Sequence, residues 1–323
     1  MRHFCTLFDS NYLLKGVAML RTLKQHCPDA YVHVLCMDGQ TREILEQLGL
    51  AHVTCLSLPE VEDQALLAVK PDRSVAEYCW TLSPCLPWYV LQHNPEIDAI
   101  TYLDADLLFY SPLQPLFDEI GDASIVIIEH RFPPALKHLE VNGRFCVEWV
   151  GFRRDAHGMA CLARWREQCI EWCFHRLEGD RMGDQKYLDQ WPASFDGVHV
   201  IQHVGAGLAP WNYAQYSFAE DNHKKIFVDG EPLIFYHFHQ FQLLSDGSFD
   251  RLSAAYRAMG REPETVYRAY EQSLIGILSE VRSIRPGFSG GVKPFLRIKS
   301  QRLVQWLVPQ EVKQWLKKFI KAV

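Results

Sequence analysis

The sequence predicts an α/β protein with a mostly parallel sheet, helices on both faces of that sheet and a basic helical tail. Along the first 130 residues, short apolar segments alternate with segments whose apolar residues recur at helical spacing. This alternation is typical of strand–helix–strand units, which build parallel sheets. The 323 residues are 48% hydrophobic and 22% charged, a composition that excludes disordered, collagen-like and low-complexity proteins.

The individual elements follow from the same periodicities. Strands are predicted where apolar and β-branched residues run together, at residues 3–8, 31–36, 52–58, 99–103 and 124–128. Helices are predicted where apolar residues repeat every three or four positions, at residues 13–23, 44–48 and 78–91. Beyond Glu129 we expect strands at residues 145–152, 198–201, 226–228 and 233–237, a helix at residues 161–177 and a loop at residues 205–213.

Charge is distributed unevenly along the chain. Residues 285–323 contain nine Lys and Arg and a single acid, a net charge of +8, so residues 1–284 carry −14 of the total of −6. An acidic body argues against a nucleic-acid enzyme and indicates work through a bound cation.

The last residues form an amphipathic segment. Within residues 312–323, Trp and Phe lie on an apolar stripe and four lysines lie on the other side. Two alternatives remain open: a helix on a membrane surface, which would place the protein at the periphery of the inner membrane face, or a last helix docked on the body.

The cysteines and the N-terminus predict a cytoplasmic protein. Ten cysteines are scattered without a Cys-x-x-Cys pair, which is typical of buried free thiols in a reducing compartment. The first residues reach Asp9 before any long apolar run, so they predict a strand rather than a signal peptide. No window approaches the roughly 20 apolar residues of a membrane-spanning helix.

The most informative candidate site follows the fourth predicted strand, where Asp104 and Asp106 stand between two apolar runs. Ligands of open α/β sheets bind at the carboxyl ends of strands. Two carboxylates in apolar surroundings are costly unless a partner compensates them, and a divalent cation that also binds phosphate would do so. The alternative is a turn whose aspartates cap backbone amides; the position after a strand favours the metal.

Further polar residues lie near predicted strands. Asp9, Asn11 and Tyr12 follow the first strand and suit a nucleoside, or else the start of the next helix. His237 and His239 lie two apart in a predicted strand and therefore share a face. Imidazole beside carboxylates suits Mn²⁺, whereas one structural and one surface histidine is the alternative.

Two more segments are candidates. Asp184 and Gln185 follow Gly183 at a predicted helix start, where either an N-cap or a site for oxygen-rich ligands is expected. Residues 129–131 follow the fifth strand and are candidates for the acceptor side. The loop at residues 205–213 would cover a bound sugar or form a simple turn.

Taken in order, these segments resemble glycosyltransferases of the GT-A fold, in particular glycosyltransferase family 8. The resemblance covers about residues 1–245, and it is based on residues 9–12 with 16–18, residues 102–106, residues 183–185 and residues 236–239. It implies a Rossmann-like nucleotide-sugar-binding catalytic domain at residues 1–249. A helical extension with the basic tail would then occupy residues 250–323.

The resemblance also implies a role for each candidate residue. Mn²⁺, or Mg²⁺, would be held by Asp104, Asp106 and His237. The substrate-binding residues would be Asp9, Asn11, Tyr12, Asp104 and His239, and the catalytic residues at the donor sugar would be Asp184 and Gln185. The expected reaction transfers a sugar from a nucleotide diphosphate sugar, favoured to be a UDP-sugar, to an acceptor hydroxyl with retention. A glycan or lipid-linked acceptor of the cell envelope is expected.

Three departures from the family pattern leave the sugar, the acceptor and the diphosphate contacts open. Cys146-Val147-Glu148 stands where relatives often have Asn-x-Gly, and residues 77–81 lack an arginine that relatives often use. Gln240-Phe241-Gln242 follows the histidine in place of Lys-Pro-Trp, and Lys293-Pro294-Phe295 lies too far downstream to be equated with that segment.

Two other functions are weighed against transfer. A nucleotidyltransferase would need a Gly-rich, basic phosphate loop after the first strand, and residues 8–16 contain one lysine and no glycine cluster. A catalytically silent binding protein could use the same cleft, although Asp104, Asp106 and His237 are all present.

Overall fold

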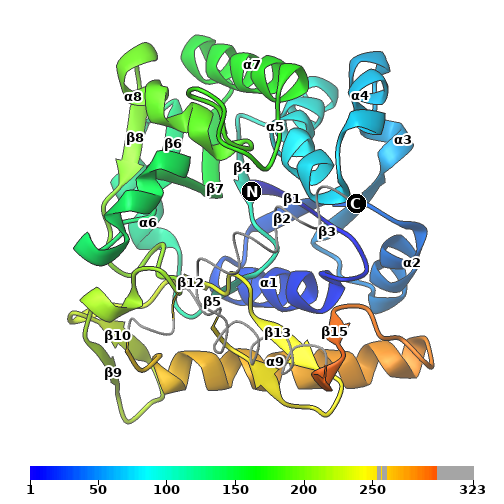
Figure 1. Cartoon of the computed structure of the whole chain (residues 1–323), viewed down its shortest axis with the longest axis vertical. Helices are drawn as coiled ribbons and strands as arrows, with labels where there is room; N and C mark the ends of the chain where they lie inside the picture. The colour runs from blue at the N-terminus through cyan, green and yellow to red at the C-terminus, as the bar shows by residue number, and fades with distance from the viewer. Residues whose placement is uncertain (253–255, 257–259, 297–323) are drawn as a thin grey trace, which may run out of the picture.

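A seven-stranded sheet forms the centre of the computed structural model, which describes residues 1–252, 256 and 260–296 (Figure 1). Its strand order is β3-β2-β1-β4-β7-β6-β8. The strands are β1 (Arg2–Phe8), β2 (Ala30–Cys36), β3 (Val53–Ser57), β4 (Ala99–Leu103), β6 (Ile125–Glu129), β7 (Phe145–Arg153) and β8 (Val198–Ile201). Only β7 runs antiparallel to its neighbours in this sheet. The predicted mostly parallel α/β class is therefore confirmed.

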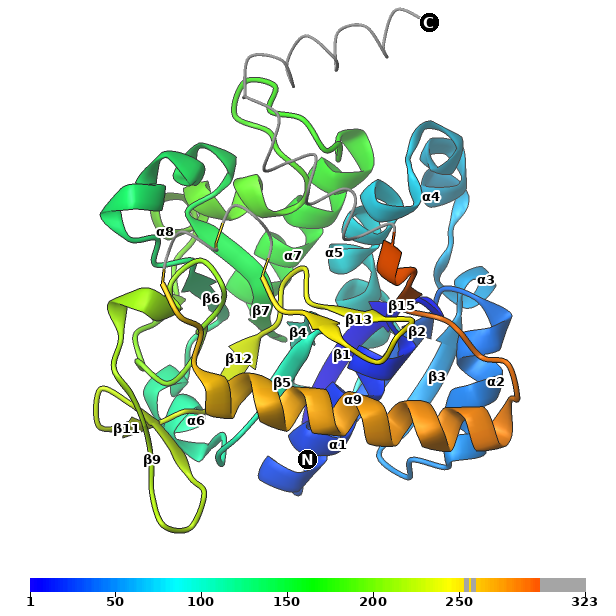
Figure 2. The same ribbon diagram turned by 60° about the horizontal axis from the view of Figure 1, so that its bottom comes forward.

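Helices cover both faces of the sheet. On one side lie α1 (Leu13–His26) and α9 (Glu264–Ile284), which pack against each other, and on the other lie α5 (Val75–His93) and α7 (Ala156–Glu171) (Figures 1 and 2). Successive residues of β1 alternate between the two cores, because Phe4 faces the α1 side and Cys5 faces the α5 side. Burial on both faces explains why these strands read as continuous apolar runs.

Smaller elements complete the described chain. The helical ones are α2 (Gly39–Leu48), α3 (Leu58–Val61), α4 (Gln64–Val69), η1 (Lys70–Asp72), α6 (Gln114–Ile120), η2 (Pro134–Asn142), η3 (Gln185–Gln190), α8 (Trp191–Ser194) and η4 (Tyr213–Gln215). The short strands are β5 (Leu107–Phe109), β9 (Phe218–Glu220), β10 (Ile226–Val228), β11 (Glu231–Pro232), β12 (Phe235–His237), β13 (Gln242–Leu244), β14 (Phe249–Asp250) and β15 (Val292–Lys293).

The central strands lie within one or two residues of their predicted positions, and two later elements differ. The helix predicted to reach residue 177 ends at Glu171, because Trp172 adopts an extended backbone and packs into the core. The strand predicted at residues 233–237 is shortened to β12, because the amide of Ile234 donates to the carbonyl of Gly205 instead. The predicted amphipathic segment at residues 312–323 lies outside the described residues. In the part that is described, no helix combines the length and apolar character needed to cross a membrane.

The segment after α9 returns to the loop that follows β1. Strand β15 pairs in parallel with β13, with Lys293 opposite Leu244. A Cβ atom at Gly290 would lie 2.2 Å from the carbonyl oxygen of Ser10, and one at Gly291 would lie 2.4 Å from that of Asn11. Contact this close requires glycine, so the two segments are packed backbone against backbone.

Acid is expected to destabilise the fold through His33. Burial, and then the charge of His3, lowers the pKa of His33 to about 4, whereas an unfolded chain has a histidine pKa near 6.5. Between pH 6.5 and 4 the unfolded state therefore binds the extra proton, and the free energy of unfolding falls with falling pH by up to about 1.4 kcal/mol per pH unit. Urea unfolding at several pH values would measure this slope, and an identical slope in His33→Gln would contradict the assignment.

Candidate functional site

The Asp-Ala-Asp segment forms the turn between β4 and β5 at the carboxyl edge of the sheet. The amide of Asp104 donates to the carbonyl of Glu148 at 3.2 Å, which extends the pairing of β4 with β7 into the turn. The carbonyl of Asp106 accepts from the amide of Phe238 at 2.9 Å. Within the described residues, neither aspartate side chain accepts a bond from a backbone amide, so the capping alternative is wrong.

His237 reaches this turn because β12 pairs antiparallel with β5. The register places His237 opposite Leu107, the residue after Asp106. The amide of His237 also donates to the carbonyl of Leu208 at 2.7 Å, which fixes its backbone from the second side. A residue 131 positions further along the chain is thus delivered to the aspartates.

The side chains of Asp104 and Asp106 both approach Nε2 of the His237 imidazole. His237 Nε2 lies 3.0 Å from Asp106 Oδ1 and 3.8 Å from Asp104 Oδ2. His237 and Asp106 are almost fully buried, whereas Asp104 keeps 31% of its side chain exposed. Burial, together with the charges of Asp106 and Glu148, raises the pKa of Asp104 to about 7, although His237 opposes this shift. Three acidic side chains therefore lie around one imidazole, at an edge of the sheet that remains partly open.

Two groups of possible metal ligands share His237 among the described residues: Asp104, Asp106 and His237, and Cys146, Glu148 and His237. The first group offers two hard oxygens and one imidazole nitrogen, a donor set that fits Mn²⁺ and, less closely, Mg²⁺. The second group is wholly buried, whereas Asp104 of the first group is partly exposed and leaves that group open toward a ligand. The aspartate group is therefore the better candidate metal site.

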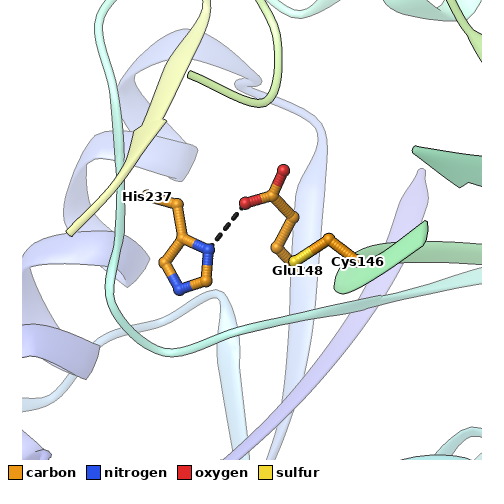
Figure 3. Close-up of side chains that lie close together, drawn as sticks. All are labelled: Cys146, Glu148 and His237. Atoms are coloured by element: carbon orange, nitrogen blue, oxygen red, sulfur yellow. Dashed lines mark hydrogen bonds and ion pairs between the residues drawn. The ribbon is translucent and has the colours of Figure 1, made fainter. Parts of the chain in front are cut away.

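Glu148 is bound to the opposite edge of the same imidazole. Figure 3 shows its carboxylate facing His237 Nδ1, with Cys146 on the same strand, and the Nδ1 to Oε2 distance is 2.6 Å. The side chain of Glu148 has no exposed area. Its other oxygen, Oε1, is buried and has no hydrogen-bond partner among the described residues.

A lysine from the first turn of α1 lies beside the site. Lys15 Nζ is 3.4 Å from Asp106 Oδ2 and 4.7 Å from the centre of the Tyr12 ring. Burial lowers the pKa of Lys15, and the charge of Asp106 raises it. Lys15 and His237 together hold the pKa of Asp106 well below its usual range in spite of burial. The positive charge of Lys293 also acts on Lys15.

The predicted nucleoside-binding residues form the loop between β1 and α1. Asp9 Oδ1 accepts from the amides of Asn11 at 2.9 Å and Tyr12 at 3.2 Å, and Asn11 Nδ2 donates to Asp9 Oδ2 at 2.9 Å. Asp9 therefore holds the start of the helix in place, which is the role that the sequence offered as the alternative to nucleoside binding. Tyr12 is 43% exposed and presents an aromatic surface next to Lys15.

The predicted sugar-pocket residues behave differently from each other. Asp184 is buried and lies at the N-cap position of η3, where its side chain makes no capping hydrogen bond. Burial, and then the charge of Asp104, raises the pKa of Asp184 to about 7. Gln185 instead donates through Nε2 to the carbonyl of Asn142 at 2.9 Å.

His239 lies beyond the end of β12 but remains near His237. The centre of the Trp211 ring is 5.2 Å from that of His237 and 5.5 Å from that of His239. Trp211 belongs to the loop predicted at residues 205–213, and its Nε1 donates to the carbonyl of His130 at 2.9 Å. Burial, and then the charge of His237, lowers the pKa of His239 to about 4. The loop and the residue after β6 therefore meet at this site.

Two residues of the site were not assigned a role from the sequence. Glu148 is the one charged residue in the apolar run from Phe145 to Phe152, and a charge in a strand with two buried faces is a usable signal. Lys15 follows Leu13 and Leu14 in an otherwise apolar helix start, which is a weaker signal of the same kind.

A cavity of about 400 Å³ lies at the other end of the sheet. Its lining includes Tyr31 and His33 of β2, His3 of β1 and Tyr89 of α5. It contains none of the ligand groups found among the described residues, so it does not belong to the candidate metal site.

Fold and side-chain geometry together define a mixed α/β protein with a candidate metal site at the carboxyl edge of its sheet. No family model matches the chain. Two proteins of Bacillus subtilis (strain 168), both described as uncharacterized, are similar to it. YfnD is 32% identical over 307 residues, which cover 94% of this chain and 98% of YfnD, and YfnF is 30% identical over 294 residues, which cover 89% and 96%. The chain belongs to the same family as YfnD and YfnF.

Solved structures are similar at lower identity. The galactosyltransferase LgtC in complex with donor and acceptor sugar analogues is 15% identical with a TM-score of 0.46, and the match covers 83% of this chain and 99% of LgtC. Mouse xyloside xylosyltransferase 1 is 15% identical with a TM-score of 0.47 over 74% of this chain and 98% of that one. The glycosyltransferase GlyE of Streptococcus pneumoniae TIGR4 is 14% identical with a TM-score of 0.48 over 86% of this chain and 63% of GlyE.

Proposed function

We propose that the protein is a metal-dependent glycosyltransferase that moves a sugar from a UDP-sugar to an acceptor hydroxyl, with retention of the anomeric configuration. The observation that supports this most is the convergence of Asp104, Asp106 and His237 at the carboxyl edge of the sheet. That edge is where open α/β sheets bind their ligands.

Each residue around the metal site has its own role in this proposal. Asp104, Asp106 and His237 hold Mn²⁺, or Mg²⁺, and Asp104 also faces the donor because part of its side chain is exposed. When bound there, the ion stabilises the negative charge that builds on the leaving diphosphate. Lys15 and Lys293 add positive charge on the same side and would contact the phosphates.

The nucleoside would lie on the loop after β1. Strand β1 is the neighbour of β4 in the sheet, so the ends of these two strands are adjacent. The exposed ring of Tyr12 offers a stacking surface for the base, and Asn11 with Asp9 offers hydrogen-bonding groups for the base edge or ribose. A base on Tyr12 would have its phosphates near Lys15, whose Nζ lies 4.7 Å from the centre of that ring and 3.4 Å from Asp106 Oδ2.

The sugar and acceptor would occupy the remaining side of the site. Asp184, whose pKa responds to the charge of Asp104, would contact donor-sugar hydroxyls, and Gln185 would have to exchange its bond to Asn142 for one near the anomeric carbon. His239 would contact substrate beside Trp211. The acceptor is proposed to be a glycan or lipid-linked glycan of the cell envelope, with peripheral membrane contact through residues 312–323.

A binding and product experiment tests the proposal. Calorimetric titration of UDP into the protein should show binding that requires Mn²⁺ and disappears with a chelator. Incubation with UDP-sugars and glycan acceptors should then yield UDP and a glycosylated product. Pyrophosphate release would indicate a nucleotidyltransferase instead, and metal-dependent binding without turnover would indicate a binding protein. An absence of UDP binding in both conditions would contradict the proposed donor.

Replacing Tyr12 by alanine is expected to weaken UDP binding about 5- to 150-fold at saturating Mn²⁺, because base–aromatic stacking contributes roughly 1–3 kcal/mol. Tyr12→Phe keeps the ring and should stay close to the wild type, which makes it the matched control. If calorimetry gives the same UDP affinity for wild type and Tyr12→Ala, the base does not bind on this loop.

A further inference from the structure

We propose that Glu148 is a positioning residue that holds His237 in the tautomer and orientation needed to bind a cation together with Asp104 and Asp106. This inference deepens the proposed function and rests on it, because it concerns the cation placed at that site. Glu148 itself is assigned no contact with the substrate or the ion.

The hydrogen bond to Nδ1 determines which nitrogen of His237 is free. Glu148 Oε2 lies 2.6 Å from Nδ1, a length typical of a bond strengthened by charge. A carboxylate accepts a hydrogen bond, so Nδ1 carries the N–H, and Nε2 is the nitrogen whose lone pair would bind a cation. Nε2 is the nitrogen that faces Asp106 and Asp104. A carboxylate behind a ligand histidine is a recurrent means of fixing the ring in metal sites.

The same residue supports two of the three ligands. Its side chain binds His237 of β12, and its backbone carbonyl accepts from the amide of Asp104 at 3.2 Å. Glu148 is part of β7, which is hydrogen-bonded to β4 on one side and β6 on the other and is almost wholly buried. Ligands that are attached to a rigid central strand keep their geometry better than ligands supported by loops alone.

The surroundings of Glu148 do not suit a purely structural carboxylate. Oε1 is buried without a hydrogen-bond partner among the described residues, an arrangement that lowers stability. Space for that oxygen depends on Gly207, since a Cβ atom there would lie 3.0 Å from Oε1 and the backbone has a φ of +67°. Buried unpaired groups of this kind need an explanation other than stability, and orientation of His237 provides one.

A metal held by Cys146, Glu148 and His237 is the competing interpretation. Two ligands of one tetrahedral zinc ion stand about 3.3 Å apart, given bonds of roughly 2.0–2.1 Å. The 2.6 Å between Glu148 Oε2 and His237 Nδ1 is shorter and is the length of a hydrogen bond. Figure 3 shows these two groups facing each other directly.

The experiment measures Mn²⁺ affinity by electron paramagnetic resonance, with the full chain alone and with UDP, in wild type, Glu148→Ala, Glu148→Gln, Cys146→Ala and Asp106→Ala. Circular dichroism confirms that each variant is folded. Glu148→Ala should bind Mn²⁺ about 10- to 100-fold more weakly than wild type. Glu148→Gln can still accept from Nδ1 through its amide oxygen and should recover part of that loss. Cys146→Ala, the matched control on the same strand and face, should bind as wild type does.

The outcomes separate this inference from the proposed function. If Asp106→Ala loses Mn²⁺ while Glu148→Ala binds as wild type, the positioning role is wrong and the metal site stands. If Cys146→Ala loses as much affinity as Glu148→Ala while Asp106→Ala loses none, the ion belongs to the competing group and both ideas fail. If wild type binds no Mn²⁺ with or without UDP, the proposed function fails first. A purely structural Glu148 would lower the melting temperature of Glu148→Ala without changing the Mn²⁺ affinity of the folded protein.

Discussion

Replacing Asp106 by alanine is expected to abolish Mn²⁺-dependent UDP binding and to lower sugar transfer by at least about 10²–10³-fold, the typical effect of removing one group that stabilises developing charge. Asp106 is more buried than Asp104 and contacts both His237 and Lys15. Its loss removes a ligand and leaves Lys15 and His237 without their shared partner. Calorimetry with UDP and Mn²⁺, followed by an assay of UDP release, would measure both effects.

Two further variants make this result specific. Asp106→Asn keeps the shape of the side chain but loses its charge, so it should also lose metal-dependent binding if charge is what matters. Asp122→Ala removes an aspartate whose side chain is fully exposed, and it should bind UDP as the wild type does. Transfer activity that survives in Asp106→Ala would exclude the aspartate group as the metal site.

Replacing Trp149 by alanine is expected to lower the free energy of unfolding by about 3–5 kcal/mol, the usual range for a large aromatic side chain deleted from a core. Trp149 is fully buried, and its ring stacks on Phe235 with centres 5.6 Å apart and meets Phe4 edge to face at 6.2 Å. The three residues belong to β7, β12 and β1, so this contact joins the sheet to the strand that carries His237.

Urea unfolding followed by circular dichroism would measure this change. Trp149→Phe keeps a ring against Phe235 and should lose clearly less stability than Trp149→Ala. The exposed Tyr12 provides the opposite case, because Tyr12→Ala should change the free energy of unfolding by less than about 0.5 kcal/mol. A change below about 1 kcal/mol in Trp149→Ala would show that the contact between β7 and β12 contributes little to stability.

The central sheet was predictable because its signals are local. Strand β4 is a five-residue run of mostly apolar residues. The two aspartates directly after it mark where the strand ends, at the carboxyl edge of the sheet. Alternation of strands and helices predicted a mostly parallel sheet, and β1 pairs in parallel with β2 and β4. The position of β7 between β4 and β6, antiparallel to both, was not predicted. The residues of a buried strand do not indicate whether it runs parallel or antiparallel to its neighbours.

The candidate site was predicted in part. Asp104, Asp106 and His237 were placed together by family resemblance, and the pairing of β5 with β12 brings His237 Nε2 to 3.0 Å from Asp106 and 3.8 Å from Asp104. Gln185 was expected at the sugar, but its amide binds the carbonyl of Asn142 in the described structure. Rotamer and loop packing decide such a contact, and neither is encoded in a short motif.

By itself, the sequence determined the α/β class, the central strands and the position of the two aspartates at a strand end, because these depend on periodicities within a few residues. Only the tertiary structure decided that Glu148 binds the back of His237, that Lys15 lies against Asp106, and that Gly290 and Gly291 pack on the loop after β1. Each of these contacts joins residues about 90 to 280 positions apart. Such contacts form only where the packed sheet and its covering helices bring distant side chains to the same edge.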